Sequence, residues 1–131
     1  MENELRILVV DDSRMMRAMI KRAIELSGVD VALQEAGNGR DALAVLERDP
    51  IDVVFTDINM PVMTGTELLR EMASRDWGHI RRVVISTDGS DARRDEVRHL
   101  DVSLYINKPF APEAVRDVLS QLSHAAHTGR S

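Results

Sequence analysis

The feature of this chain that most constrains its fold is an alternation, repeated five times, between two kinds of segment. Short segments rich in β-branched residues, the pattern typical of strands, recur at 5–10, 31–36, 51–56, 82–86 and 102–106. Each is followed by a longer segment whose apolar residues are spaced three and four apart, the pattern of a helix. Strands that alternate with helices pair in parallel through right-handed crossovers. The sequence therefore predicts an α/β fold with five helices and a doubly wound, five-stranded parallel sheet.

Residues that start and stop helices support this interpretation. Gly28 is typical of a position just past a helix end. The run Thr64-Gly65-Thr66-Glu67 predicts a capping box at the start of the third helix, and Pro112 suits the first turn of the last one. The first helix is expected to bury one apolar stripe: Met16, Met19, Ile20, Ala23 and Ile24. The last helix is expected to end near Ser123, which predicts one domain over 1–123 and a flexible tail over 124–131.

The composition excludes several classes of protein. Of the 131 residues, 44% are hydrophobic and 30% charged, as in a soluble globular domain. The chain has no cysteine, which excludes thiol catalysis, disulfides and zinc sites built on sulfur. A net charge of −5 argues against a protein that binds nucleic acid, and no apolar run is long enough to cross a membrane. Because the N-terminus lacks a signal-peptide pattern, we expect a cytoplasmic protein without membrane insertion.

Polar residues follow four of the five predicted strands. In an open parallel sheet the carboxyl ends of the strands form one edge, where ligands bind. Six residues are expected to meet there: Asp11 and Asp12 after the first strand, Asp57 after the third, Ser86 and Thr87 at the end of the fourth, and Lys108 after the fifth. Taken singly, each has an ordinary explanation as a cap or a turn residue. Their conjunction is what indicates a functional site.

The chemistry of these residues points to phosphoryl transfer. Three carboxylates crowded together repel one another, and a divalent cation relieves that repulsion. Ligands that are all oxygen favour Mg²⁺ over zinc. Lys108 supplies a fixed positive charge for an arriving anion, and a hydroxyl at the end of the fourth strand could donate a hydrogen bond to it. The set therefore predicts transfer of a phosphoryl group to a carboxylate nucleophile.

The chain resembles the receiver domain of two-component response regulators, above all the stand-alone chemotaxis type, over residues 5–122. The motifs that carry the resemblance are Val9-Val10-Asp11-Asp12-Ser13, Asp57-Ile58-Asn59-Met60-Pro61-Val62-Met63-Thr64-Gly65, Ser86-Thr87 and Lys108-Pro109-Phe110. The resemblance implies a flavodoxin-like three-layer sandwich with strand order 2-1-3-4-5.

The resemblance also implies a role for each site residue. Asp57 would be the phospho-acceptor, and Lys108 would pair with the phosphoryl oxygens. Mg²⁺ would be bound by a set of four residues: Asp11, Asp12, Asp57 and, through its backbone carbonyl, Asn59.

Two hydroxyls compete for the role of the switch residue that the resemblance implies. Counting back from Lys108 favours Ser86, whereas counting forward from Asp57 favours Thr87. We expect Ser86, because the segment after it then needs no gap. Tyr105, three residues before Lys108, matches the switch aromatic, so phosphorylation is expected to reshape the face made by the fourth helix, the fifth strand and the fifth helix.

The function that follows is a phosphorylation-activated switch and not an enzyme with a separate substrate. Its expected partners are a sensor histidine kinase or a histidine phosphotransfer protein upstream and a protein target downstream, in chemotaxis. Two alternatives stay open: an intermediate receiver in a multistep phosphorelay, and a receiver that belongs to a larger response regulator. An aspartate-based phosphohydrolase is disfavoured because its usual Asp-x-Asp motif does not follow the first strand.

Overall fold

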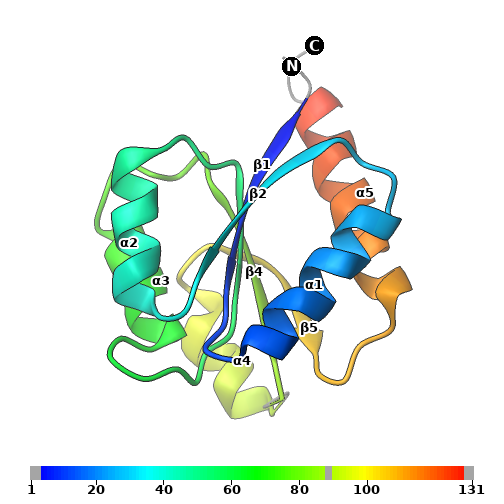
Figure 1. Cartoon of the computed structure of the whole chain (residues 1–131). Coiled ribbons are helices and arrows are strands. Elements are labelled where there is room, and N and C mark those ends of the chain that lie inside the picture. Colours follow the sequence, from blue (N-terminus) through cyan, green and yellow to red (C-terminus); the bar gives the residue numbers. More distant parts are fainter. Residues whose placement is uncertain (1–3, 88–89, 129–131) are drawn as a thin grey trace.

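The structure, a computed structural model, describes residues 4–87 and 90–128 and contains the ten predicted elements in the predicted order (Figure 1). The strands are β1 (Leu5–Val10), β2 (Val31–Ala36), β3 (Val53–Thr56), β4 (Arg81–Ser86) and β5 (Val102–Asn107). The helices are α1 (Arg14–Leu26), α2 (Gly39–Arg48), α3 (Gly65–Ala73), α4 (Asp91–Arg98) and α5 (Pro112–Thr128). Within this part of the chain, no helix is both long enough and apolar enough to cross a bilayer.

The five strands form one parallel sheet in the order β2-β1-β3-β4-β5. The strand order that the resemblance implied is therefore confirmed. Because β1 and β3 are neighbours at the centre, the segments that follow them leave the sheet side by side. The segments after β4 and β5 leave the same edge, which brings all four together.

Two apolar cores fix the helices against the sheet. Alternate residues of each strand point to opposite faces. On one face Leu8 and Val54 pack with apolar residues of α2, α3 and α4, and on the other Ile7 and Phe55 pack with those of α1 and α5. Figure 1 shows the resulting three layers, with α1 and α5 on one side of the sheet and α2, α3 and α4 on the other.

Capping side chains fix the starts of two helices at the site, α1 and α3. Ser13 caps α1, its hydroxyl accepting a hydrogen bond from the amide of Met16 at 3.1 Å. Thr64 and Glu67 form the predicted capping box at the start of α3, each side chain bonding the other residue's amide. α5 begins at Pro112, as predicted.

Five details differ from the prediction. β4 begins at Arg81 and not at 82, and β5 ends at Asn107 and not at 106. Met19 is 49% exposed, so it does not belong to the buried stripe of α1. β3 begins at Val53 and not at 51, because its pairing with β1 starts with Val53 opposite Ile7. The expected end of the last helix near Ser123 is also wrong, since α5 continues to Thr128. The extra residues, 124–128, include two alanines and come before Gly129, so no residue among them is one that stops a helix.

Candidate functional site

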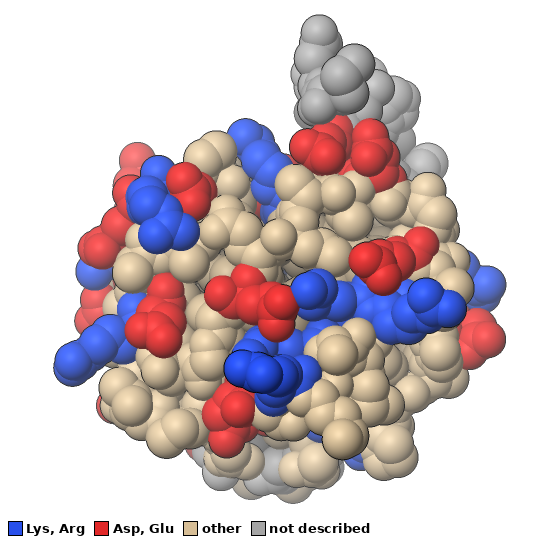
Figure 2. Space-filling view, viewed as in Figure 1, with Lys and Arg blue, Asp and Glu red and all other residues tan. Residues whose placement is uncertain are grey.

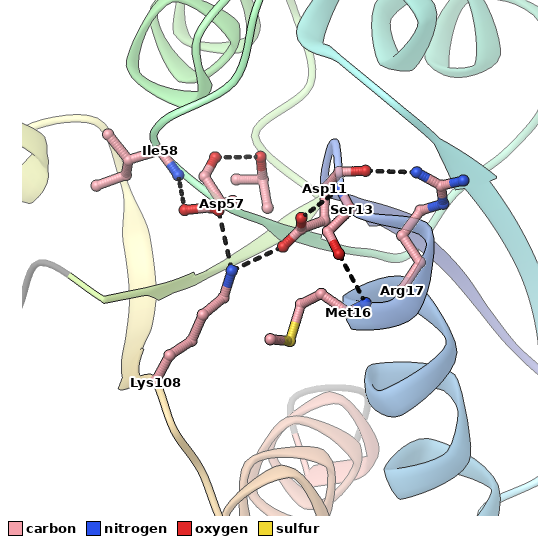
Figure 3. Close-up of polar contacts among 8 residues, drawn as sticks. Asp11, Ser13, Met16, Arg17, Asp57, Ile58 and Lys108 are labelled. Atoms are coloured by element: carbon pink, nitrogen blue, oxygen red, sulfur yellow. Dashed lines mark hydrogen bonds and ion pairs between the residues drawn. The ribbon is translucent and has the colours of Figure 1, made fainter.

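Three segments bring the predicted acids and the predicted lysine together at the carboxyl edge of the sheet. Asp11 and Asp12 follow β1, Asp57 follows β3 and Lys108 follows β5. One carboxylate oxygen from each of the three aspartates lies within 4.8 Å of the other two. Figure 3 shows Asp11, Asp57 and Lys108 pointing toward one another from separate strands. The predicted convergence of Asp11, Asp12, Asp57 and Lys108 is thus present in the fold.

Lys108 joins two of the three acids. Its Nζ donates to Asp11 Oδ2 at 2.8 Å and to Asp57 Oδ2 at 2.9 Å (Figure 3). The side chains of Lys108, Asp11 and Asp57 are 8%, 2% and 12% exposed, so little solvent screens their charges. Burial lowers the pKa of Lys108, but the hydrogen bonds and charges of Asp11 and Asp57 outweigh it and leave that pKa above its ordinary value. The ammonium is therefore a permanent cation at this site.

Hydrogen bonds hold both the carboxylate and the backbone of Asp57 in place. The amide of Ile58 donates to Asp57 Oδ1 at 2.7 Å, while the hydroxyl of Thr56 donates to the carbonyl of Asp57 at 2.8 Å. The amide of Gly65, at the start of α3, donates to the carbonyl of Ile58 at 2.8 Å. α3 therefore begins directly against the backbone that carries Asp57.

A tight turn holds the acidic pair. The amide of Ser13 donates to Asp11 Oδ1 at 2.9 Å, and the amide of Asp11 donates to the carbonyl of Ala36 on β2 at 3.1 Å. Arg17 of α1 donates from Nη1 to the carbonyl of Asp11 at 2.6 Å (Figure 3). Asp11 is buried and Asp12 is exposed, so one acid lies in the floor of the site and the other at its rim.

The residues of the predicted switch surround this edge. Ser86 is fully buried at the end of β4, whereas Thr87, the next residue, is exposed. Tyr105 lies half-buried on β5, and the guanidinium carbon of Arg94 on α4 stands 4.6 Å from the centre of its ring. Asn59, whose carbonyl is a predicted ligand, lies in the loop after Asp57 and is exposed.

An apolar groove of about 360 Å³ opens beside the site, between α1 and the start of α5. Its lining includes Met15, Met19 and Phe110, of which Met15 is 75% exposed. Met15 lies three residues after Asp12 and Phe110 two residues after Lys108, so the groove adjoins the charged edge. Figure 2 shows Lys and Arg side chains gathered over the surface that α1 occupies in Figure 1.

The donor set suits a hard divalent cation. All three carboxylates present oxygen, and the cluster contains no sulfur or imidazole ligand. An exposed rim acid leaves space for water on the cation, which Mg²⁺ retains in most of its sites. Asp11, Asp12 and Asp57 are therefore able to hold a metal ion.

Two contributors to the site were not predicted. Arg17 lies on a helix, and sequence spacing alone does not show that its side chain turns back to the carbonyl of Asp11. The sequence explains Gly65 only as part of a helix start, yet a Cβ there would collide with the backbone carbonyl of Asp57. The sequence does show a basic residue one turn into the helix after the acids, and a glycine inside a capping box. Neither pattern is specific to a functional site.

Comparison with known families gives one match that spans most of the chain. A family profile described as the response regulator receiver domain matches residues 7–120. These residues include β1 from Ile7 on, the other four strands in full and the four charged residues of the site.

Individual proteins are also similar to this chain. The chemotaxis protein CheY of Thermotoga maritima is 36% identical over 118 residues, which cover 90% of this chain and 97% of that protein. A protein-glutamate methylesterase/protein-glutamine glutaminase of Paramagnetospirillum magneticum is 35% identical over 109 residues, covering 82% of this chain and 28% of that longer protein. The solved structure of the chemotaxis response regulator CheY4 of Vibrio cholerae matches with a TM-score of 0.82 and 28% identity, covering 91% and 98% of the two chains.

Proposed function

The chain belongs to the response regulator receiver family, and from that premise we propose that Asp57 accepts a phosphoryl group from a phosphohistidine of a partner protein. The observation that carries the proposal is the pairing of Asp57 with Lys108 inside a cluster of three acids. A receiver of this kind is a phosphorylation switch, and its chemistry is limited to its own phosphorylation and dephosphorylation.

The proposed transfer is a displacement at phosphorus. A lone pair on a carboxylate oxygen of Asp57 forms the new O–P bond, while the P–N bond to histidine breaks and its electrons return to the imidazole nitrogen. The amide of Ile58 holds one carboxylate oxygen of Asp57 and Lys108 the other, so the nucleophile is oriented before the donor arrives. Lys108 then pairs with the phosphoryl oxygens.

We assign Mg²⁺ to the acidic cluster, with Asp11, Asp12, Asp57 and the backbone carbonyl of Asn59 as its protein ligands. When bound, the ion supplies positive charge that offsets the charge on the transferring phosphoryl oxygens. The fit of an oxygen-only donor set to a hard cation supports this assignment.

For the switch hydroxyl, the sheet register supports Thr87 over our sequence-based expectation of Ser86. Ser86 pairs with Asn107, so Thr87 follows at the level of Lys108. Side chains alternate along a strand, and Thr87 is exposed at the edge whereas Ser86 is fully buried. We therefore propose that Thr87 donates to the phosphoryl group and that Tyr105 responds to its movement, reshaping the α4-β5-α5 face for a target protein.

The groove beside the site is where we place the phosphate donor. A histidine kinase or histidine phosphotransfer protein must bring its phosphohistidine to Asp57, and the groove lined by Met15, Met19 and Phe110 adjoins that point. α1 carries four basic residues and one acidic residue in a chain of net charge −5, which favours an acidic, partly apolar partner surface.

Chemotaxis is the pathway we propose for the output, because two of the similar proteins carry chemotaxis in their names and are covered almost completely. A role in a multistep relay or inside a larger response regulator is the second candidate. It is favoured by the methylesterase, in which the similar segment is a minor part of a longer chain. A cytoplasmic location stays a prediction from the sequence.

The proposed acceptor is tested by intact mass after incubation with acetyl phosphate, with and without Mg²⁺. We expect one added phosphoryl group on the wild-type protein with Mg²⁺ and none on Asp57→Asn, which keeps the shape of the side chain. Equal labelling of the two proteins would place the acceptor elsewhere, and no labelling of a folded wild-type protein would contradict the proposal.

The switch assignment is tested by amide chemical shifts of residues 102–107 after phosphorylation. We expect Ser86→Ala to keep the shift changes of the wild-type protein and Thr87→Ala to lose them while still accepting phosphate. The opposite pattern would restore Ser86 as the switch residue.

A further inference from the structure

The backbone of Asp11 is attached to strand β2 at two points. Its amide donates to the carbonyl of Ala36, as described above. Its carbonyl accepts from Arg17 Nη1 at 2.6 Å, and Arg17 Nε donates to Glu35 Oε1 of β2 at 2.8 Å. One guanidinium therefore bridges the acidic turn to the strand beside it.

The bridge is built from charge-assisted bonds in a partly buried place. The side chain of Arg17 is only 16% exposed, although the residue lies in the first turn of α1. Glu35 also accepts from Lys21 Nζ at 2.7 Å. These hydrogen bonds from Lys21 and Arg17 hold the pKa of Glu35 below its ordinary value, so the carboxylate stays ionised at neutral pH.

The bonded carbonyl lies in the peptide that connects Asp11 to Asp12. Any rotation of that peptide plane moves Asp12 relative to Asp11. Because Asp12 is exposed, packing does not fix its direction. A side chain that holds the connecting peptide is therefore well placed to keep both carboxylates directed at the same point.

We propose that Arg17 is a positioning residue for the cation site: it fixes the Asp11–Asp12 peptide against β2 through Glu35 and thereby keeps the two acids in a geometry that binds a divalent cation. The proposal rests on the proposed function, in which the acidic cluster takes Mg²⁺. Partners that orient metal ligands without touching the metal commonly change affinity by about 10- to 100-fold when they are removed.

A simple effect of charge predicts the opposite result. Arg17 is a cation close to the site, so its removal alone would strengthen the binding of a second cation by reducing repulsion. Positioning predicts weaker binding in spite of that change. The sign of the effect therefore separates the two explanations.

The experiment is calorimetric titration with Mg²⁺ of the wild-type protein, Arg17→Gln, Arg17→Lys, Glu35→Gln and Lys21→Gln, each checked for folding by circular dichroism. We expect Arg17→Gln to weaken Mg²⁺ binding by about tenfold or more. Arg17→Lys keeps the charge but offers one nitrogen where Arg17 uses two, Nε and Nη1, so it should lose part of the affinity. Lys21→Gln is the matched control: it removes a cation from the same helix and the same partner but leaves the bond to Asp11, so its affinity should stay within about twofold of wild type.

Amide hydrogen exchange of residues 11–13 without added cation gives a second measurement. We expect faster exchange in Arg17→Gln and Glu35→Gln than in Lys21→Gln, because the turn has lost its attachment to β2. If the wild-type protein binds Mg²⁺ and Arg17→Gln binds it equally well or more tightly, the positioning role is wrong and the proposed function stands. If the folded wild-type protein binds no Mg²⁺, both proposals fail.

Discussion

At the scale of single residues, the first residue of α3, Gly65, lies directly against the backbone of Asp57. The amide of Gly65 bonds the carbonyl of Ile58, which brings its Cα against the peptide that follows Asp57. A side chain has no room there, because the atoms it would meet belong to the backbone and not to a flexible side chain.

We therefore expect Gly65→Ala to destabilise the protein by about 1–3 kcal/mol or more, the range for overpacking, and to displace Asp57 enough to slow its phosphorylation. Urea unfolding and the rate of labelling by acetyl phosphate measure the two effects. Gly78→Ala is the control, since a Cβ at Gly78 has no neighbour within 4 Å. Equal stability of the two variants would show that the α3 start can move away without cost.

The residues of the site differ in how well the sequence predicts their roles. Asp11, Asp57 and Lys108 were predictable because each directly follows a strand, and strand ends are fixed by the sheet. Arg17 and Gly65 were not, because their roles depend on where a side chain turns and on how near two backbones pass. Such distances arise only from packing.

At the scale of elements, the start of β1 is tied to the segment that leads into β3. Arg6 donates to Asp52 from its backbone amide at 2.9 Å and from Nε and Nη2 at 3.1 Å each. Burial raises the pKa of Asp52, but the hydrogen bonds and the charge of Arg6 outweigh it and leave that pKa below its ordinary value. The pair therefore stabilises the fold while Asp52 is ionised.

Because the pKa of Asp52 is lowered in the folded protein, the stability that the ion pair contributes depends on pH. A carboxyl whose pKa is lower in the folded state stabilises the protein above the unfolded-state pKa of about 3.9, and this contribution disappears as the pH falls through the folded-state pKa. We expect Asp52→Asn to cost about 1 kcal/mol at pH 7, as for a partly exposed ion pair, and much less at pH 2. Urea unfolding of both proteins at the two pH values measures the difference; a constant gap would exclude the ion pair as its cause.

Elements themselves were predictable where their residues had a single interpretation. Leu5–Val10 and Val31–Ala36 match the prediction, because each is a short segment made mostly of apolar residues. The β-branched pattern places Ile51 in the third strand, but in the structure Ile51 packs in the core just before β3 starts. Burial and strand pairing give the same sequence pattern, so a boundary of this kind needs the structure.

At the scale of the whole molecule, folding brings Asp57 to the neighbouring carboxylates of Asp11 and Asp12, from which the unfolded chain keeps it apart. In the folded protein Lys108 bonds two of the three carboxylates, and a bound divalent cation would add to that compensation. Because the unfolded chain has no such cluster, the cation should bind only the folded state and stabilise it.

We expect Mg²⁺ at one hundred times its dissociation constant to raise the free energy of unfolding by about 2.7 kcal/mol. Thermal unfolding with MgCl₂, against NaCl at equal ionic strength, measures the gain, and chelation should reverse it. Asp12→Asn should remove most of the gain without changing the buried acids. An equal effect of the two salts would mean that no specific site exists.

The long sequence separations within the site also have a consequence during synthesis. Lys108 follows its partner Asp57 by 51 positions and its partner Asp11 by 97. At about 5–20 residues per second on the ribosome, roughly 3–10 s pass between the appearance of Asp57 and that of Lys108. Over that interval the nascent chain contains the acceptor but lacks both the lysine and the last strand of the sheet. In the proposed function Lys108 pairs with the transferred phosphoryl group, so a nascent chain is expected to complete its phosphorylation site only late in translation.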